Sequence, residues 1–510
     1  MPYNKKHQGR LPSVIIIGAG IGGLCCAIDV KAAGVRELTV LERSDEVGGT
    51  WHANRYPGVA VDTSILTYSL SFDSNPGWRR LYASGSDLHD YLVGLSHKYG
   101  LREHVRFGVA VEELRWDGAE GLWTVSTDTG EVLRAQVVIV ATGVLSTPKI
   151  PAILGLDSFE GTVLHSADWD TGFTARGRRI AQVGSGASAA QVVPELAKDA
   201  DALYVLQRSA AWVLPRNDRL ITAREQYWYR RCPWLLKAKR WRQYWANDRV
   251  SLGFERQDRT LDKQERIALE FLERSVPDPD LRRHLRPDYR IGCKRRVMSD
   301  DWYAALIQPH VELIPHALRE VKANSVVATD GSERKVDTIV FSTGFAVEQL
   351  VPLKVFGKQG IELHETWADG SRSHLGITVD GFPNLFFVMG PNTGIGSGSA
   401  AFMIEAQSRY IAQALRHFAR HRLHSIEVDP AVAARSYHSV QRRLAKSVYG
   451  SGCSGWYQGE NGRIDTLWPG MLFEYWLRTR RFNPAHFRAV RAGLDRRSTD
   501  AEHDTKTSGV

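Results

Sequence analysis

The chain has 510 residues, 43% hydrophobic and 24% charged, and its 66 Lys and Arg residues exceed its 57 Asp and Glu residues by nine. This composition excludes a collagen-like or disordered chain, and the length suits about three domains whose cores need no structural metal. Five cysteines without a framework spacing exclude a disulfide scaffold and indicate reduced thiols. Without a long apolar run or a secretory signal pattern, the sequence predicts a cytoplasmic protein with no transmembrane segment.

Two strand–helix–strand patterns organise the chain. Short aliphatic, β-branched runs that end at glycines are typical of strands buried on both faces of a parallel sheet. Each of the two patterns spans about 30 residues, as a βαβ unit does. The predicted strands are residues 14–17, 37–41, 137–140, 179–183, 202–206, 338–341 and 385–389, and the predicted helices are residues 22–33, 191–197 and 401–419.

The sequence therefore predicts an α/β fold with two Rossmann-like dinucleotide-binding domains and a helical insertion. We expect the first domain to comprise residues 1–148 and 385–510, and the second to comprise residues 149–215 and 292–384. Residues 216–291 contain few glycines and many basic and aromatic residues at helical spacing, which predicts the insertion.

Residues 228–247 of this insertion interleave basic and aromatic side chains. Such a segment is compatible with an anionic membrane surface or with nucleic acid. Because the net charge is modest, the interpretation that we favour is an amphipathic helical lid that packs its tryptophans inward and binds no nucleic acid.

A glycine motif directly follows the first predicted strand. Gly18 permits a tight turn, Gly20 allows the backbone to approach a pyrophosphate, and Gly23 allows close packing of the helix on the strand. The N–H groups at the start of the helix favour phosphate. Glu42 ends the second strand, where a carboxylate accepts hydrogen bonds from a ribose 2′-hydroxyl and repels a 2′-phosphate. On these grounds the motif predicts a site for FAD or NAD.

A second motif at residues 184–189 follows the strand that ends at residue 183, with Ala189 in place of the third glycine. At the position of the acidic residue this unit has Arg208, and a guanidinium there pairs with a 2′-phosphate. The simplest assignment is FAD at the first site and NADPH at the second. The predicted contacts with NADPH are Gly184, Gly186, Ser188, Arg208 and Ser209.

Two nucleotides in one chain imply that a hydride passes from the nicotinamide to the flavin, and the next electron acceptor decides the function. Cys25 and Cys26 are adjacent on a predicted helix, and Cys293 and Cys453 have no nearby partner in the sequence, so no redox pair is predicted. The histidines and cysteines show no spacing typical of metal ligands, and we expect no metal. Dioxygen remains the plausible acceptor.

Residues 159–170 carry a specific resemblance. Phe159, Gly161, His165, Trp169 and Asp170 fit the pattern F-x-G-x-x-x-H-x-x-x-W-(P/D), which resembles the fingerprint of Baeyer–Villiger monooxygenases. The related flavin-containing and N-hydroxylating monooxygenases usually carry Tyr or Phe followed by Lys or Arg at its end. The similarity extends from about residue 12 to about residue 485.

Residues 49–62 resemble a second family motif, G-x-W-x-x-x-x-(F/Y)-P-G-x-x-x-D, and ATG-like signatures at residues 141–143 and 342–344 also fit. The resemblance implies that this segment lies against FAD, with its aromatic side chains packing rather than reacting. The cofactor-binding residues that it implies are Gly49, Thr50, Trp51, Tyr56 and Asp62.

The resemblance also implies a mechanism. Reduced flavin reacts with dioxygen to give a C4a-peroxyflavin, which must stay deprotonated to attack a ketone, and the adduct rearranges to an ester or lactone. In the family an arginine in a G-x-K-R segment stabilises these anions, and Arg295 matches it. Asp62 matches the acid that holds this arginine, and Lys294 matches a residue that contacts the 2′-phosphate of NADP.

Trp456 and Tyr457 resemble a late segment of the family that closes over the substrate, and we interpret His165 as part of a conformational switch. The expected partners are a small-molecule ketone and dioxygen. Oxygenation of sulfur or nitrogen in small molecules, and a simple NADPH–flavin reductase, remain as alternatives, and the oligomeric state stays open.

Overall fold

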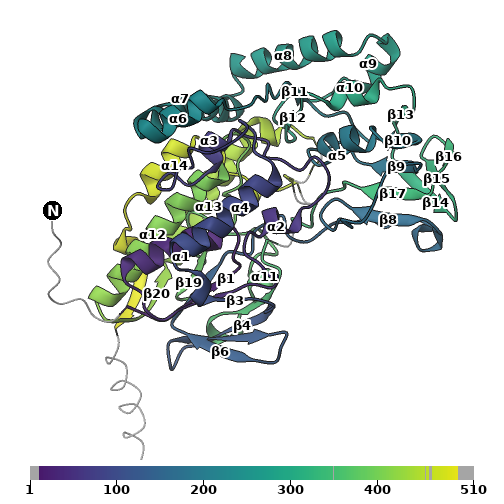
Figure 1. Ribbon diagram of the computed structural model, residues 1–510. Coiled ribbons are helices and arrows are strands. Elements are labelled where there is room, and N and C mark those ends of the chain that lie inside the picture. The colour runs from purple at the N-terminus through teal and green to yellow at the C-terminus, as the bar shows by residue number, and fades with distance from the viewer. Residues whose placement is uncertain (1–10, 348–349, 454, 456, 459–461, 492–510) are drawn as a thin grey trace, which may run out of the picture.

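The computed structural model describes residues 11–347, 350–453, 455, 457–458 and 462–491. Two α/β units lie side by side, and a layer of helices from the insertion runs along the top of both (Figure 1). Each unit is built on a five-stranded parallel sheet, so the predicted fold class is confirmed. No helix in the described ranges combines the length and the apolar character needed to cross a bilayer.

The first sheet has the strand order β19-β7-β1-β2-β3. Its centre is β1 (Val14–Ile17), all of whose side chains are buried because both faces of the sheet are covered. Val14 and Ile16 face a core shared with α1 (Ile21–Ala33) and α12 (Ala400–Arg420). Ile15 and Ile17 face the other side, where a four-stranded mixed sheet packs. The remaining strands of the first sheet are β2 (Leu38–Leu41), β3 (Val105–Arg106), β7 (Val137–Val140) and β19 (Leu385–Phe387).

The second sheet repeats this plan with the order β13-β10-β9-β17-β8. One face packs against α5 (Ala189–Leu196) and α10 (Trp302–Leu306). The opposite face packs against a three-stranded antiparallel sheet. The strands are β8 (Thr162–His165), β9 (Arg179–Val183), β10 (Ala202–Leu206), β13 (Val311–Ile314) and β17 (Thr338–Phe341).

The two smaller sheets were not predicted from the sequence, because several of their strands alternate buried and partly exposed residues instead of forming the continuous buried runs of the parallel strands. The sheet on the first unit contains β4 (Val111–Asp117), β5 (Leu122–Thr127), β6 (Val132–Ala135) and β18 (Lys354–Phe356). The sheet on the second unit contains β14 (Leu318–Lys322), β15 (Ser325–Ala328) and β16 (Glu333–Lys335).

The insertion is helical, as the sequence predicted. It consists of α6 (Ala223–Arg231), α7 (Pro233–Arg256), α8 (Arg259–Ser275) and α9 (Pro279–Leu285). It leaves the second unit after β11 (Val213–Leu214) and returns at β12 (Val297–Met298), and these two strands pair in parallel. The site residues 294 and 295 therefore lie where the insertion rejoins the second unit.

The two parallel sheets draw their strands from different parts of the chain. The first sheet draws its strands from residues 14–140 and 385–387, and the second from residues 162–341; the division into domains at the residues given above stays a proposal. The additional helices are α2 (Thr50–Ala53), α3 (Ile65–Tyr68), α4 (Gly85–Lys98), α11 (Leu363–Thr366), α13 (Pro430–Lys446) and α14 (Leu472–Thr479), and the last two strands are β20 (Leu423–Val428) and β21 (Phe487–Arg491).

Candidate active site

The first glycine turn joins β1 to α1. Gly18 has φ 101°, and a Cβ atom there would lie 2.7 Å from the carbonyl oxygen of Ala141. A Cβ atom on Gly23 would lie 1.8 Å from the carbonyl oxygen of Gly18, so helix and strand meet only because this residue is glycine. Gly20 caps α1 without a side-chain hydrogen bond. The backbone N–H groups at the start of α1 are therefore open to a pyrophosphate.

Glu42 lies at the end of β2 and is 5% exposed. Its Oε2 atom accepts a hydrogen bond from the backbone N–H of Ala19 at 2.6 Å, and its Oε1 atom accepts one from Ser44 at 3.0 Å. These bonds fix the carboxylate beside the glycine turn, and each oxygen keeps a lone pair for a ribose hydroxyl. The first turn therefore fits the adenosine diphosphate half of FAD.

Residues 49–62 lie beside the first glycine turn. Gly49 has φ 54°, and a Cβ atom there would lie 2.9 Å from the Cα atom of Gly20, so the two backbones approach closely. Thr50 begins α2 with an exposed side chain. The ring of Trp51 packs edge-to-face on Tyr68, with 5.7 Å between the ring centroids. This arrangement agrees with the packing role that the family resemblance implies for these residues.

Tyr56 connects the two units. Its hydroxyl donates a hydrogen bond to Oε1 of Gln191 on α5 at 2.9 Å, and burial raises the pKa of Tyr56 to about 12. The amide of Gln191 in turn donates to the carbonyl oxygen of Ala60 at 3.0 Å. A Cβ atom on Gly58 would lie 2.5 Å from the carbonyl oxygen of Gln191. Sequence reasoning missed Gln191, because its role depends on contacts about 130 residues away in the chain.

The second glycine turn joins β9 to α5 and resembles the first at its first glycine, although its helix begins two residues later. Gly184 has φ 109°, and a Cβ atom there would lie 2.6 Å from the carbonyl oxygen of Ser342. A Cβ atom on Gly186 would meet nothing within 4 Å, so this residue borders open space. Ser188 precedes α5 and makes no capping hydrogen bond with its side chain. The N-terminus of α5 is thus available to phosphates, as the N-terminus of α1 is.

Three predicted contacts of the 2′-phosphate gather at the end of β10. Arg208 is exposed, and Nζ of Lys294 donates a hydrogen bond to Oγ of Ser209 at 3.2 Å. Partial burial and the positive charge of Arg208 lower the pKa of Lys294. Two cations that repel each other are stabilised by a shared dianion, so this group fits the 2′-phosphate of NADPH.

Asp62 and Arg295 form an ion pair across 233 residues of sequence. Nε of Arg295 donates to Oδ2 of Asp62 at 3.0 Å, and Nη2 donates to the same oxygen. The side chain of Arg295 is 36% exposed and that of Asp62 is 24% exposed. The carboxylate of Asp62 is the main cause that raises the pKa of Arg295, which keeps the guanidinium charged. Asp62 is not a helix cap, because Ser64 caps the following helix, α3.

Tyr457 completes the surroundings of Arg295. Its side chain is 2% exposed and forms a hydrogen bond with the guanidinium of Arg295. Burial raises the pKa of Tyr457, so it stays a neutral hydroxyl. Its ring packs edge-to-face on Tyr449. Trp456, which the sequence placed in the same closing segment, lies outside the described residues.

The expectation that all five cysteines are unpaired thiols is wrong for two of them. Cys293 and Cys453 are joined in a disulfide, with 6.2 Å between their Cα atoms. This pairing could not be predicted from the sequence, because 160 residues separate the two cysteines. The bond attaches the loop of Lys294 and Arg295 to the segment that leads to Tyr457. Cys25 and Cys26 are free thiols buried in the core, where they pack against apolar side chains.

The fingerprint residues lie on and around the edge strand β8. Phe159 packs against the core of the second unit, and a Cβ atom on Gly161 would lie 2.2 Å from the carbonyl oxygen of Asp337. His165 is buried, accepts a hydrogen bond from the N–H of Ala167 at Nδ1, and has its pKa lowered by burial. Trp169 packs edge-to-face on a neighbouring aromatic ring. Their role as a switch stays a prediction.

The comparisons with known proteins agree on one family. Residues 12–270 match the model of flavin-binding monooxygenase-like proteins. A Baeyer–Villiger monooxygenase of Streptomyces coelicolor is 40% identical over 94% of this chain and 92% of its own. One of Pseudomonas aeruginosa is 38% identical over 97% of this chain and 94% of its own.

The solved structures point the same way. An oxidised steroid monooxygenase bound to NADP is 27% identical, with a TM-score of 0.83 over 94% of this chain and 99% of its own. The chain therefore belongs to the flavin-binding monooxygenase-like family, and within it to the Baeyer–Villiger monooxygenases.

Proposed function

We propose that the chain is an FAD- and NADPH-dependent Baeyer–Villiger monooxygenase, which inserts one oxygen atom of dioxygen next to a ketone carbonyl to give an ester or lactone. The observation that carries this proposal is the placement of Lys294 and Arg295. Lys294 contacts Ser209 at the second nucleotide site, and its neighbour Arg295 pairs with Asp62 of the first unit. One loop thus presents a cation to each of the two sites.

The residues of the first site would bind FAD through the backbone of the turn at Gly18 and Gly20 and through the carboxylate of Glu42. The residues of the second site would bind NADPH through the turn at Gly184 and through the cations Arg208 and Lys294. Bound FAD supplies the chemistry that this chain lacks, which is transfer of electrons from NADPH to dioxygen.

Arg295 would act as the catalytic cation. A guanidinium held in a fixed orientation stabilises negative charge as it develops on the carbonyl oxygen of a ketone. Asp62 and Tyr457 act through Arg295. The carboxylate of Asp62 holds the Nε edge of the guanidinium, and the hydroxyl of Tyr457 forms a hydrogen bond with it. Because burial raises the pKa of Tyr457, its hydroxyl stays neutral and exchanges no proton with the substrate at neutral pH. They are positioning residues for the cation.

The experiment is reduction of the purified protein with NADPH under anaerobic conditions, followed by air and a panel of ketones and sulfides, with products identified by mass. Ester or lactone formation supports the proposal. If only sulfides are oxygenated, the chain is a sulfur- or nitrogen-oxygenating enzyme of the same family. If NADPH is consumed and no organic product forms with any compound, the chain is a flavin reductase.

Two further assignments belong to this proposal. We assign His165 to a conformational switch between the units. It ends β8 and pairs with the last residue of β17, directly before the second ATG-like signature at residues 342–344. We also assign the enzyme to the cytoplasm; three of its five cysteines, Cys25, Cys26 and Cys232, are free thiols, and this assignment requires that the Cys293–Cys453 disulfide persist in a reducing compartment.

A further inference from the structure

The outer face of α7 carries a row of tryptophans. Trp234, Trp241 and Trp245 are 65%, 55% and 44% exposed. Spacings of seven and four residues place them on one side of the helix. The rings of Trp241 and Trp245 stack with 6.5 Å between centroids. The interpretation of this segment as a lid with inward-facing tryptophans is therefore wrong, because the buried face of α7 is occupied instead by Leu236 and Tyr244.

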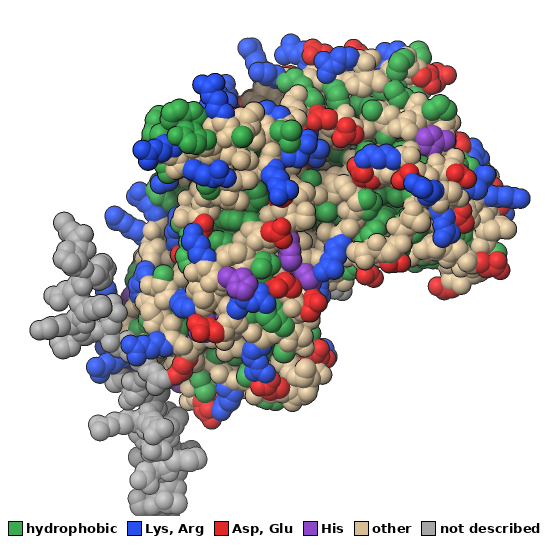
Figure 2. Space-filling model, viewed as in Figure 1, with side chains coloured by type: hydrophobic (Ala, Val, Ile, Leu, Met, Phe, Trp, Pro, Cys, Tyr) green, Lys and Arg blue, Asp and Glu red, His purple; other side chains and the backbone are tan. Residues whose placement is uncertain are grey.

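Basic side chains lie between these tryptophans. Lys237, Arg242 and Arg249 are exposed, and their positions in the helix place them on the two flanks of the tryptophan row. Across the described part of the chain, Lys237 and Arg242 form no ion pair. Figure 2 shows a group of apolar side chains bordered by Lys and Arg over the end of α6 and α7, at the upper left. The face thus combines aromatic area with positive charges that no acidic residue balances.

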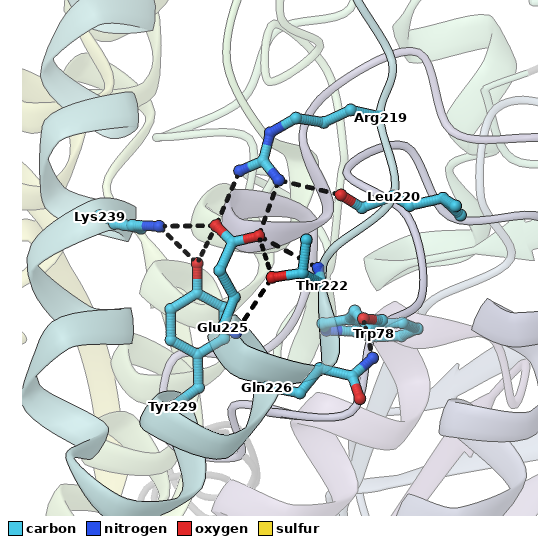
Figure 3. Close-up of polar contacts among 8 residues, drawn as sticks. All are labelled: Trp78, Arg219, Leu220, Thr222, Glu225, Gln226, Tyr229 and Lys239. Carbon is cyan, nitrogen blue, oxygen red and sulfur yellow. Dashed lines mark hydrogen bonds and ion pairs between the residues drawn. The ribbon is translucent and has the colours of Figure 1, made fainter.

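The acidic residue of α6 is paired with basic side chains. Glu225 accepts hydrogen bonds from Arg219 at 2.8 and 3.0 Å and from Lys239 at 3.1 Å (Figure 3). It also closes a capping box with Thr222 at the start of α6. These contacts lower the pKa of Glu225, and the hydrogen bond from Arg219 is the main cause. The cluster neutralises Glu225 and fixes α6 against α7, so the outer face keeps its orientation.

The two acidic residues of α7 also face the interior. Asp248 is fully buried and accepts a hydrogen bond from the backbone N–H of Leu472 at 2.6 Å, at the start of α14. Glu255 accepts a hydrogen bond from Arg443 of α13 at 2.6 Å. The acidic side chains of α6 and α7 are thus each buried or paired with a basic side chain, so they leave the charges of Lys237 and Arg242 unbalanced.

The apolar surface continues onto α14. The rings of Trp245 and Phe473 lie 5.2 Å apart, and Phe473 stacks on Trp476 at 5.7 Å. Leu477 is 42% exposed, and the guanidinium of Arg480 lies 5.9 Å from the ring centre of Trp476. Two helices that are distant in sequence therefore contribute to one surface of aromatic and basic side chains.

We propose that this surface, the outer face of α7 with the adjoining part of α14, docks on an anionic phospholipid bilayer. Tryptophan rings partition into the headgroup region, and Lys and Arg side chains reach the phosphates beside them. A symmetric contact with a second copy would place Lys237 and Arg242 against like charges, which is unfavourable. The proposal is independent of the oxygenation reaction.

The test uses the full-length holoenzyme and vesicles of phosphatidylcholine, either pure or with about 30% phosphatidylglycerol, pelleted at about 0.15 M salt. We expect pelleting with the anionic vesicles alone, and its loss as salt rises. The triple variant W234S/W241S/W245S is expected to lose at least about tenfold in partitioning, and Lys237→Ala and Arg242→Ala about fivefold each. Leu154→Ser, at a side chain that is 73% exposed on the second unit, is the matched control and should bind as the wild type does.

Retention of FAD and an unchanged thermal unfolding curve show that each variant is folded. The proposal is overturned if the anionic vesicles do not pellet the protein, if both vesicles pellet it equally, or if the triple tryptophan variant still binds. It is also overturned if the wild type forms a dimer that the triple variant abolishes, or if duplex DNA retains the protein at the same salt concentration.

Discussion

Removal of the guanidinium at position 295 is the sharpest test of the site. With a side chain that is 36% exposed, Arg295 sits in a medium between protein and water, and an effective dielectric constant of about 30 is reasonable. At about 4 Å from a developing oxyanion, one charge is then worth about 2.8 kcal/mol. This corresponds to about a hundredfold loss in the rate of oxygenation.

We therefore expect Arg295→Ala to form ester about a hundredfold more slowly, while NADPH still reduces the flavin at a rate within about threefold of the wild type. Stopped-flow absorbance under anaerobic conditions measures reduction, and product analysis in air measures oxygenation. Arg274→Ala, which removes an exposed arginine from α8, controls for the loss of one positive charge. An Arg295→Ala enzyme that makes ester within tenfold of the wild-type rate, or that loses reduction to the same extent, would refute the assignment.

Three more predictions concern nucleotide choice, the disulfide and pH. Arg208→Ala should lower the ratio of kcat/KM for NADPH to that for NADH by about tenfold or more, because one charge-assisted contact is lost; an unchanged ratio argues against a 2′-phosphate site. A digest without reductant should yield a peptide that links Cys293 to Cys453, and Cys453→Ser should lower the free energy of unfolding by about 2–4 kcal/mol; separate peptides in the wild type contradict the pairing. Burial and the charges of His486 and Arg478 lower the pKa of His374 to about 3. In the unfolded chain the pKa is about 6.5, so the fold is fully stable above that pH and loses stability as pH falls from 6.5 toward 3. Between about pH 8 and 5 the loss is about 2 kcal/mol in chemical denaturation, and His374→Gln should remove it; an equal pH dependence in the variant excludes this source.

The parts of the site that the sequence predicted correctly are local in the chain. Each glycine turn, with Glu42 or Arg208 at the end of the next strand, is contained within about 30 residues, so spacing alone places the groups around a nucleotide. Seven strands of the two parallel sheets were predicted for the same reason, since a run buried on both faces needs no partner to be recognised. The strands β3, β8 and β13, which complete these sheets, were not predicted. The first helix begins at Ile21, one residue before the predicted start.

What the sequence could not predict depends on contacts between distant segments. The pairing of Asp62 with Arg295 came only through the family resemblance, because each residue alone resembles a cap or a solvated charge. Gln191 and the disulfide carry no local signal at all. The direction of the tryptophans on α7 was predicted wrongly, because periodicity shows that a helix has two faces and does not show which one the protein covers.

The adjacency of Lys294 and Arg295 on one loop has a consequence for engineering. Redesign of the enzyme toward the cheaper nucleotide NADH would begin at Lys294, one peptide bond away from the group assigned to oxygen transfer. Any backbone adjustment there displaces the guanidinium, so selectivity for the reductant and the fraction of it wasted as hydrogen peroxide cannot be tuned separately at this position. Substitutions at Arg208, which lies in a different segment just after β10, avoid that coupling.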